Sequence, residues 1–203
     1  MDRKRRAQQI VRVLKRLYTH PKTALHFKNP WQLLVAVILS AQCTDKKVNE
    51  VTAKLFKKYR TLEDYVHADP REFQKDIHAT GFFRAKTKSI LTSAKMIKEK
   101  FRGRVPRTMH EMLTLRGVAR KTANVVLGTA YGVVEGIAVD THVRRLARLH
   151  GLTIHTDPVK IEQDLMQLLP RSEWLNFNHR LVQYGRDYCP ARAHDHRKCP
   201  LSN

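Results

Sequence analysis

One segment, from Leu115 to Arg145, constrains the fold more than any other part of the chain. It begins with a short turn of apolar residues around a glycine (115–119), which separates one helical pattern (108–114) from the next (120–131). Two helices joined by so short a turn direct the unpaired backbone N–H groups of the second helix outward. These amides and the helix dipole together favour a phosphate group. The segment therefore predicts a helical hairpin that binds an anion.

Charged side chains surround this turn. Arg116, Arg120 and Lys121 add positive charge at the predicted start of the second helix. Nineteen residues after Lys121 comes Asp140, at the position where a cap for a helix over 141–150 is expected. The positive end of the helix dipole and the neighbouring arginines disfavour the ammonium form of Lys121. Among the lysines of the chain, this one is best placed to react as a neutral amine.

Four motifs resemble those of the helix-hairpin-helix DNA glycosylases, and specifically of the endonuclease III family. They occur in the family's order: LLVAVILSAQCTD (33–45), GFFRAKTKSI (81–90), LRGVARKTANVVL (115–127) and IAVDTH (137–142). The hairpin departs from the usual Leu-Pro-Gly-Val-Gly, because Arg116 replaces the proline and Ala119 the second glycine. An alanine is compatible with the motif only if position 119 does not need a positive φ.

The resemblance implies a bifunctional DNA glycosylase and AP lyase that removes oxidised pyrimidines in base excision repair. Lys121 would be the nucleophile that forms a Schiff base with the sugar, and Asp140 its acid–base partner. On the residues alone, a solvated or phosphate-binding lysine and a plain helix cap remain alternatives. A monofunctional glycosylase for mismatched thymine or adenine, or a non-catalytic protein that binds damaged DNA, are the alternative functions.

DNA contacts are also implied by the resemblance. Gln42 would fill the space left by the flipped base, and Phe82 would enter the duplex as a wedge. The alternatives are an amide satisfied at a helix end for Gln42 and simple core packing for Phe82 and Phe83. The residues expected to contact the DNA backbone or to support the site are Arg84, Lys86, Lys88, Arg116, Gly117, Val118, Ala119, Arg120 and His142.

Charge favours nucleic acid as the partner. Lysine and arginine total 39 against 18 acidic residues, a formal net charge of +21 that gives salt-dependent affinity for phosphates. We expect a monomer that binds double-stranded DNA with damaged bases or abasic sites and no membrane. The three cysteines are an odd number and do not make a closed disulfide framework, which fits a reduced cytosolic compartment. With the family resemblance, we expect a cytoplasmic, nucleoid-associated bacterial or archaeal protein. The N-terminal segment is typical of an amphipathic helix rather than a signal peptide.

The fold class expected is all-α, since the hydrophobic pattern has helical periods and no convincing alternation. The resemblance implies two lobes with the DNA cleft between them. One is a six-helix lobe over 22–134 that contains the hairpin motif (about 108–131), and the other joins residues 1–21 to 135–203. The helix caps expected are Asp2, Asn29, Thr44 or Asp45, Thr61, Asp69, Thr108, Asp140, Asp157 and Ser172.

The C-terminal segment 189–203 resembles the family's [4Fe–4S] loop, Cys-x6-Cys-x2-Cys-x5-Cys. Cys189 and Cys199 match the first and third ligands, His196 stands at the second, and the fourth would fall two residues beyond Asn203, so the ligand set is incomplete. Because histidine replaces cysteine in some iron–sulfur sites, an altered cluster in a longer natural chain is one alternative. A zinc site that adds His194 is an alternative on ligand type. We expect a degenerate, metal-free loop whose Arg192, Arg197 and Lys198 contact DNA. The base chemistry needs no metal, and a monovalent cation on the carbonyls of residues 116 and 118 is implied at the hairpin.

Overall fold

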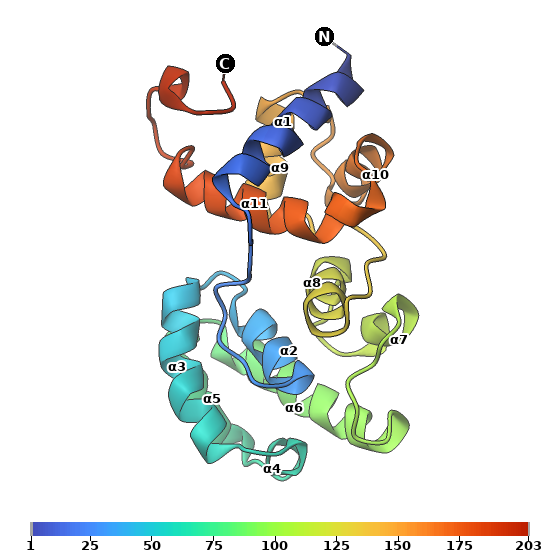
Figure 1. Cartoon of the computed structure of the whole chain (residues 1–203). Coiled ribbons are helices and arrows are strands. Elements are labelled where there is room, and N and C mark those ends of the chain that lie inside the picture. Colours follow the sequence, from blue (N-terminus) through green and yellow to red (C-terminus); the bar gives the residue numbers. More distant parts are fainter. Residues whose placement is uncertain (1, 203) are drawn as a thin grey trace. The chain divides into compact units, whose positions relative to one another are not determined.

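The structure, a computed structural model, describes residues 2–202 and shows helices and no strand within that range (Figure 1). The all-α prediction is therefore confirmed. The α-helices are α1 (Arg3–Leu17), α2 (Pro30–Leu39), α3 (Asp45–Lys58), α4 (Leu62–Val66), α5 (Pro70–Ile77), α6 (Phe83–Lys100), α7 (Met109–Thr114), α8 (Arg120–Tyr131), α9 (Thr141–Leu149), α10 (Pro158–Leu168) and α11 (Trp174–Asp187). The 3-10 helices are η1 (His78–Thr80), η2 (Arg171–Glu173) and η3 (His196–Lys198).

The chain divides into two compact units. Residues 24–133 form one, here called the hairpin unit, which contains α2 to α8. Residues up to 23 and residues from 134 onward form the other, here called the terminal unit. Among residues 2–202, no helix is both long and apolar enough to span a membrane.

Helix α2 is the centre of the hairpin unit. Every residue from Trp31 to Leu39 is buried, and the helix packs against α3, α6 and α8. Burial on all sides is what the unbroken apolar pattern of this helix requires. An aromatic cluster closes the core beside it, with Trp31 5.1 Å from Tyr65 between ring centroids. Because α3, α6 and α8 all pack on α2, the turns that precede them are held to this core.

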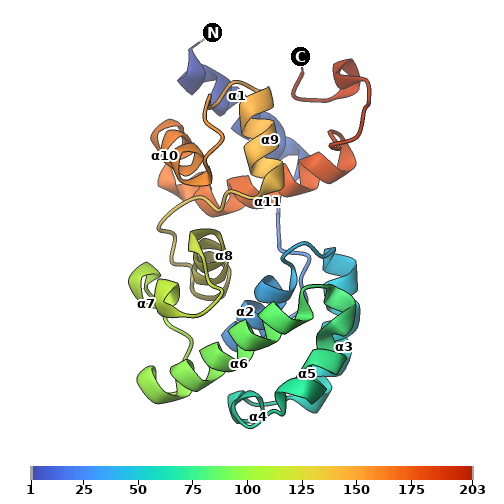
Figure 2. The same cartoon turned by 180° about the vertical axis from the view of Figure 1, so that it is seen from behind.

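The terminal unit buries an apolar cluster between α1, α9, α10 and α11, which lie together in both views (Figures 1 and 2). Leu14, Leu146, Leu165 and Tyr184 are each fully buried in it, one from each helix. The apolar face of α1 therefore packs against helices that come much later in the sequence. The N-terminal segment belongs to the same core as the C-terminal helices.

Most predicted helix caps are confirmed by hydrogen bonds from backbone N–H groups to the capping side chains. These caps are Asn29, Thr44, Thr61, Asp69, Thr108, Asp140 and Asp157. Two predictions are wrong. Asp2 precedes α1 without a side-chain cap, and Ser172 lies inside η2, so that α11 begins only at Trp174. Glu173, the residue before α11, instead pairs with Arg180 at 2.7 Å.

Candidate catalytic and DNA-binding residues

The predicted hairpin is present as α7, a five-residue turn and α8. Val118 anchors the turn in the core, and its N–H donates to the carbonyl of Leu115 at 3.2 Å. Ser93 donates from Oγ to the carbonyl of Arg116 at 3.1 Å, which ties the turn to α6. Gly117 has φ +76°, and a Cβ built there would lie 2.5 Å from Oγ of Ser89. Only glycine meets both conditions.

Ala119 precedes α8 with φ −92°, so this position needs no positive φ and tolerates alanine. Its side chain cannot cap the helix, and α8 begins without a side-chain cap. The amides of the first turn are therefore not taken by a capping side chain, as the anion-binding prediction requires. Arg116 is exposed and Arg120 half-buried, so cationic groups stand at this end of α8. Lys121, the second residue of α8, is half-buried.

Asp140 belongs to the terminal unit and is half-buried at the start of α9. Its Oδ1 accepts a hydrogen bond from the N–H of Val143 at 2.8 Å. A carboxylate offers two oxygens, and a cap of this kind occupies one of them. The capping role thus fixes the orientation of the group and is compatible with a second role in proton transfer. Lys121 lies on α8 of the hairpin unit, whereas Asp140 precedes α9 of the terminal unit.

The two residues expected to enter the duplex share an uncommon backbone. Gln42 has φ +52° and Phe82 has φ +47°, both in the left-handed region that side chains rarely adopt. Gln42 is exposed, and Phe82 keeps 64% of its surface in solvent. Phe82 therefore does not pack in the core, whereas Phe83 is half-buried with its ring centroid 4.5 Å from that of His78. Strained positions of this type are frequent at binding sites, although Arg102, after the end of α6, has the same left-handed backbone with φ +53°.

Lys86 corrects one prediction. The sequence predicts a phosphate contact for it, but the residue is buried, and its Nζ donates to the carbonyls of Leu39 at 2.8 Å and Thr80 at 2.7 Å. Burial lowers the pKa of this lysine below its usual range. Arg84 and Lys88 are exposed, as a phosphate contact requires. The sequence offers no signal for the internal role of Lys86, because one of its partners, Leu39, lies 47 residues away along the chain.

His142 follows Asp140 on α9 and is half-buried. Its Nδ1 faces α11 closely, since a Cβ on Gly185 would lie 2.5 Å from that atom. His142 also lines a pocket of about 430 Å³, whose other lining residues are Thr141, Arg144, Arg145, Arg148 and Ala191. Three arginines give this surface of the terminal unit a positive charge, suited to a phosphate backbone.

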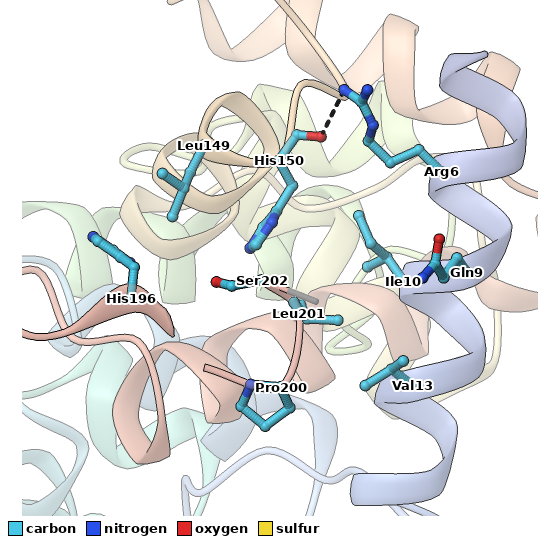
Figure 3. Close-up of a pocket in the computed structure, with 10 residues that line it drawn as sticks. All are labelled: Arg6, Gln9, Ile10, Val13, Leu149, His150, His196, Pro200, Leu201 and Ser202. Carbon is cyan, nitrogen blue, oxygen red and sulfur yellow. Dashed lines mark hydrogen bonds between the residues drawn. The ribbon is translucent and has the colours of Figure 1, made fainter. Parts of the chain in front are cut away.

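A second pocket, of about 400 Å³, lies between α1, the end of α9 and the C-terminal segment (Figure 3). Arg6 donates from Nη1 to the carbonyl of His150 at 3.4 Å beside it. Burial lowers the pKa of His150 to about 4, so the imidazole is neutral at pH 7 and does not attract anions. Lys121 and Asp140 are not among the described residues that line this pocket.

A group that could hold a metal ion lies in the C-terminal segment. One donor atom from each of Cys189, His194, His196 and Cys199 lies within 4.8 Å of all the others. The sequence predicts an incomplete cluster site from His196 and the two cysteines, and His194 joins them in space. A [4Fe–4S] cluster is held by thiolates. Two thiols and two imidazoles do not fit that cluster.

Comparison with known proteins accounts for the whole chain. Residues 35–171 match the family described as HhH-GPD superfamily base excision DNA repair protein. Endonuclease III of Synechocystis sp. is 48% identical over 202 residues, which cover 100% of this chain and 92% of that protein. The chain belongs to the endonuclease III family. Endonuclease III of Bacillus subtilis is also similar, with 45% identity over 91% of this chain and 84% of that protein.

Solved structures agree with this assignment to the endonuclease III family. A non-covalent endonuclease III–DNA complex matches with a TM-score of 0.94 and 40% identity, over 100% of this chain and 94% of that one. A trapped endonuclease III–DNA covalent intermediate, an estranged-adenine complex, matches with a TM-score of 0.90 and 41% identity, over 96% of this chain and 93% of that one. The expected two-lobed helix-hairpin-helix DNA glycosylase fold is confirmed.

Proposed function

We propose that the chain is a bifunctional DNA glycosylase and AP lyase of base excision repair, which removes oxidised pyrimidines and cuts the strand by β-elimination. The observation that carries the proposal is its likeness, at 41% identity over 96% of the chain, to an endonuclease III trapped covalently on DNA. Covalent trapping requires a nucleophile on the protein. Lys121, at the start of α8 beside the hairpin, is the residue that we assign to this role.

The reaction begins when the damaged nucleotide leaves the base stack, because its glycosidic carbon is otherwise out of reach. The Nζ of neutral Lys121 then bonds to C1′ as the bond between C1′ and the base breaks. The base leaves with a proton, and the sugar ring opens to give a Schiff base on Lys121. The imine makes the C2′ proton acidic, and loss of that proton expels the 3′ phosphate. Water finally hydrolyses the imine and frees the enzyme.

Asp140 supports two steps of this scheme. Its carboxylate accepts the proton that Lys121 must lose, and it stabilises the positive charge that grows on the sugar as the base departs. The hydrogen bond to Val143 N at 2.8 Å supports the proposal, because it holds the carboxylate in one orientation. A preorganised carboxylate stabilises developing charge without having to reorient during the reaction.

Binding of DNA combines three kinds of contact. The turn at 116–120 grips a phosphate through backbone N–H groups and arginines, with a monovalent cation on the carbonyls of residues 116 and 118 as a further element. Gln42 and Phe82 enter the duplex, where Phe82 unstacks a base step and Gln42 fills the vacated space. Arg84 and His142 also contact the DNA. The net charge of +21 supplies affinity that falls as salt concentration rises.

We also propose that the protein is a cytoplasmic monomer that acts on double-stranded DNA with damaged bases or abasic sites. The chemistry assigned to Lys121 and Asp140 needs no metal. Because the thiol and imidazole donors do not fit a [4Fe–4S] cluster, no step is assigned to one.

Duplexes that each carry one lesion test the proposal. Thymine glycol, a G:T mismatch, a mismatched adenine and an abasic site would be incubated with the protein, and base release and strand cleavage would be scored separately. We expect thymine glycol to be released and its strand to be cut without added alkali. Cleavage that appears only after alkali would favour the monofunctional alternative. Binding without base release or cleavage would favour a non-catalytic protein.

A further inference from the structure

The Cys/His group in the C-terminal segment has the composition of a site for one metal ion. Cys189 follows the end of α11, and Cys199 follows η3, so the two cysteines begin and end a loop of the terminal unit (Figure 1). Both cysteines are buried, whereas His194 is half-buried and His196 exposed. We propose that Cys189, His194, His196 and Cys199 bind a single tetrahedral zinc ion. The proposal rests on this ligand geometry and not on the glycosylase chemistry.

The spacing of the donor atoms supports one ion. Sγ of Cys189 lies 3.7 Å from Nδ1 of His196, and Sγ of Cys199 lies 3.3 Å from Nε2 of His194. With Zn–S near 2.3 Å and Zn–N near 2.0–2.1 Å, a sulfur and a nitrogen on one tetrahedral zinc stand about 3.6 Å apart. The two observed separations lie on either side of that value. Two thiolates also neutralise the charge of the ion, so that the site can be partly buried.

The groups around the donors favour metal ligation. Nδ1 of His194 lies 2.9 Å from the carbonyl of Arg192. An N–H that donates there leaves the lone pair of Nε2 directed at Cys199, which is the tautomer a ligand needs. Arg145 donates from Nη1 to Sγ of Cys189 at 3.6 Å, and from Nη2 to the carbonyl of the same residue. These two hydrogen bonds hold Cys189 in place against α9.

Iron–sulfur clusters fit the same donors less well. A four-iron cluster takes four thiolates. A two-iron cluster with mixed ligands has its histidines on one iron and its cysteines on the other, which separates sulfur from nitrogen. Here each cysteine sulfur instead lies within 3.7 Å of a histidine nitrogen. The thiol of Cys199 also donates to the carbonyl of Tyr188 at 3.2 Å, a hydrogen bond that would be exchanged for the bond to zinc.

Bound zinc would cross-link a loop that lies mostly in solvent. Residues 190–198 are largely exposed, with Cys189 and Cys199 as the buried points at either end. His196 lines the open pocket beside α1, which gives an ion a path to the site (Figure 3). Ala191 of the loop lines the arginine-lined pocket on α9, and Arg145 of that pocket donates to the carbonyl of Cys189. Bound zinc would therefore order a basic surface suited to DNA phosphates.

The test uses the full chain, produced with both zinc and iron in the medium and purified without chelators. Metal content and acid-labile sulfide would be measured on the native protein. Zinc would then be removed and replaced by Co²⁺, whose visible absorption distinguishes tetrahedral from octahedral coordination. Cys199→Ser and His194→Ala would be compared with Cys43→Ser and His110→Ala, which change the same residue types outside the group. His194 is half-buried in the loop, so its replacement leaves the core intact should Cys199→Ser fail to fold.

We expect one zinc per chain, no sulfide and tetrahedral cobalt in the native protein and in both control variants. Loss of one ligand should lower zinc affinity by at least about tenfold. Loss of zinc should also speed proteolytic cleavage within 190–198 and weaken binding to undamaged duplex at low salt. Iron with stoichiometric sulfide would overturn the proposal in favour of a cluster. Octahedral cobalt, or native protein that binds neither zinc nor cobalt, would overturn it in favour of a metal-free loop.

Discussion

Lys86 donates a hydrogen bond of 2.8 Å from Nζ to the carbonyl of Leu39, the last residue of α2. A second hydrogen bond joins the same ammonium group to the carbonyl of Thr80 at 2.7 Å. Gln42 follows the first of these carbonyls by three residues, and Phe82 follows the second by two. One buried cation therefore fixes the starting points of both loops that we expect to enter the duplex.

Replacement of Lys86 by methionine should destabilise the hairpin unit. It removes the donor from two buried carbonyls, and each unsatisfied group costs about 1–3 kcal/mol. Denaturant unfolding of Lys86→Met and of Lys88→Met, an exposed neighbour on the same helix, measures the difference. We expect a change within about 0.5 kcal/mol for Lys88→Met. Equal and small changes in both variants would show that the contacts of Lys86 do not stabilise the fold.

Replacement of Phe82 by glycine should raise stability and lower activity. Left-handed backbone at a residue with a side chain costs about 1–3 kcal/mol, which exceeds the entropy cost of glycine of about 0.5–1 kcal/mol. The exposed ring loses little packing when it is removed. Arg102 has φ +53° and is exposed, so Arg102→Gly is the matched control for strain relief.

Thermal unfolding and single-turnover base release together decide this prediction. Both glycine variants should unfold at a higher temperature than the parent, and only Phe82→Gly should release the base more slowly. Unchanged base release in Phe82→Gly would remove Phe82 from the DNA contacts.

Local signals in the sequence predict much of this structure. Asn29 and Asp157 are recognisable as caps because a cap depends on a side chain and the backbone a few residues ahead. Ser172 is not a cap, and it lies in a segment whose contacts reach across the sequence. Glu173 pairs with Lys15 at 2.8 Å as well as with Arg180, and η2 lies in place of a capped start to α11.

The functional residues likewise divide into those that the sequence locates and those that only the folded structure reveals. Lys121 and Asp140 are located by motif, and the structure places each in the first turn or cap that the motif predicts. Lys86 resembles any basic residue near DNA, because its role depends on Leu39 and Thr80, which come together only in the folded unit. The approach of His194 to Cys199 at 3.3 Å likewise depends on the path of the loop, which spacing does not determine.

Replacement of Gly117 by alanine should disrupt the hairpin. The backbone has φ +76°, and the new Cβ would lie 2.7 Å from Cβ of Ser89, so a clash adds to the strain. Gly132 has φ +67°, and a Cβ added there would meet nothing within 4 Å, so Gly132→Ala reports strain alone. We expect Gly117→Ala to lose about 1–3 kcal/mol more stability than Gly132→Ala. DNA affinity, measured in the same two variants, should fall only in Gly117→Ala.

Replacement of Asp140 by asparagine should separate its role as a helix cap from its role in catalysis. Asn and Asp cap helices about equally well, so Asp140→Asn should retain the stability of α9, whereas Asp140→Ala should lose about 1 kcal/mol. The amide cannot accept a proton as the carboxylate does, and base release should therefore fall sharply in both variants. Denaturant unfolding and single-turnover kinetics would be run on the same preparations. Full activity in Asp140→Asn would reduce Asp140 to a helix cap.

Borohydride trapping shows directly whether Lys121 forms a Schiff base with DNA. The protein would be mixed with a duplex that carries thymine glycol or an abasic site, reduced, and examined for a covalent protein–DNA band. Lys121→Gln would be compared with Lys160→Gln, which changes an exposed lysine in the first turn of α10. We predict a band on both duplexes with the parent and with Lys160→Gln, and none with Lys121→Gln. A band that persists in Lys121→Gln, or no band despite tight binding, would contradict the account.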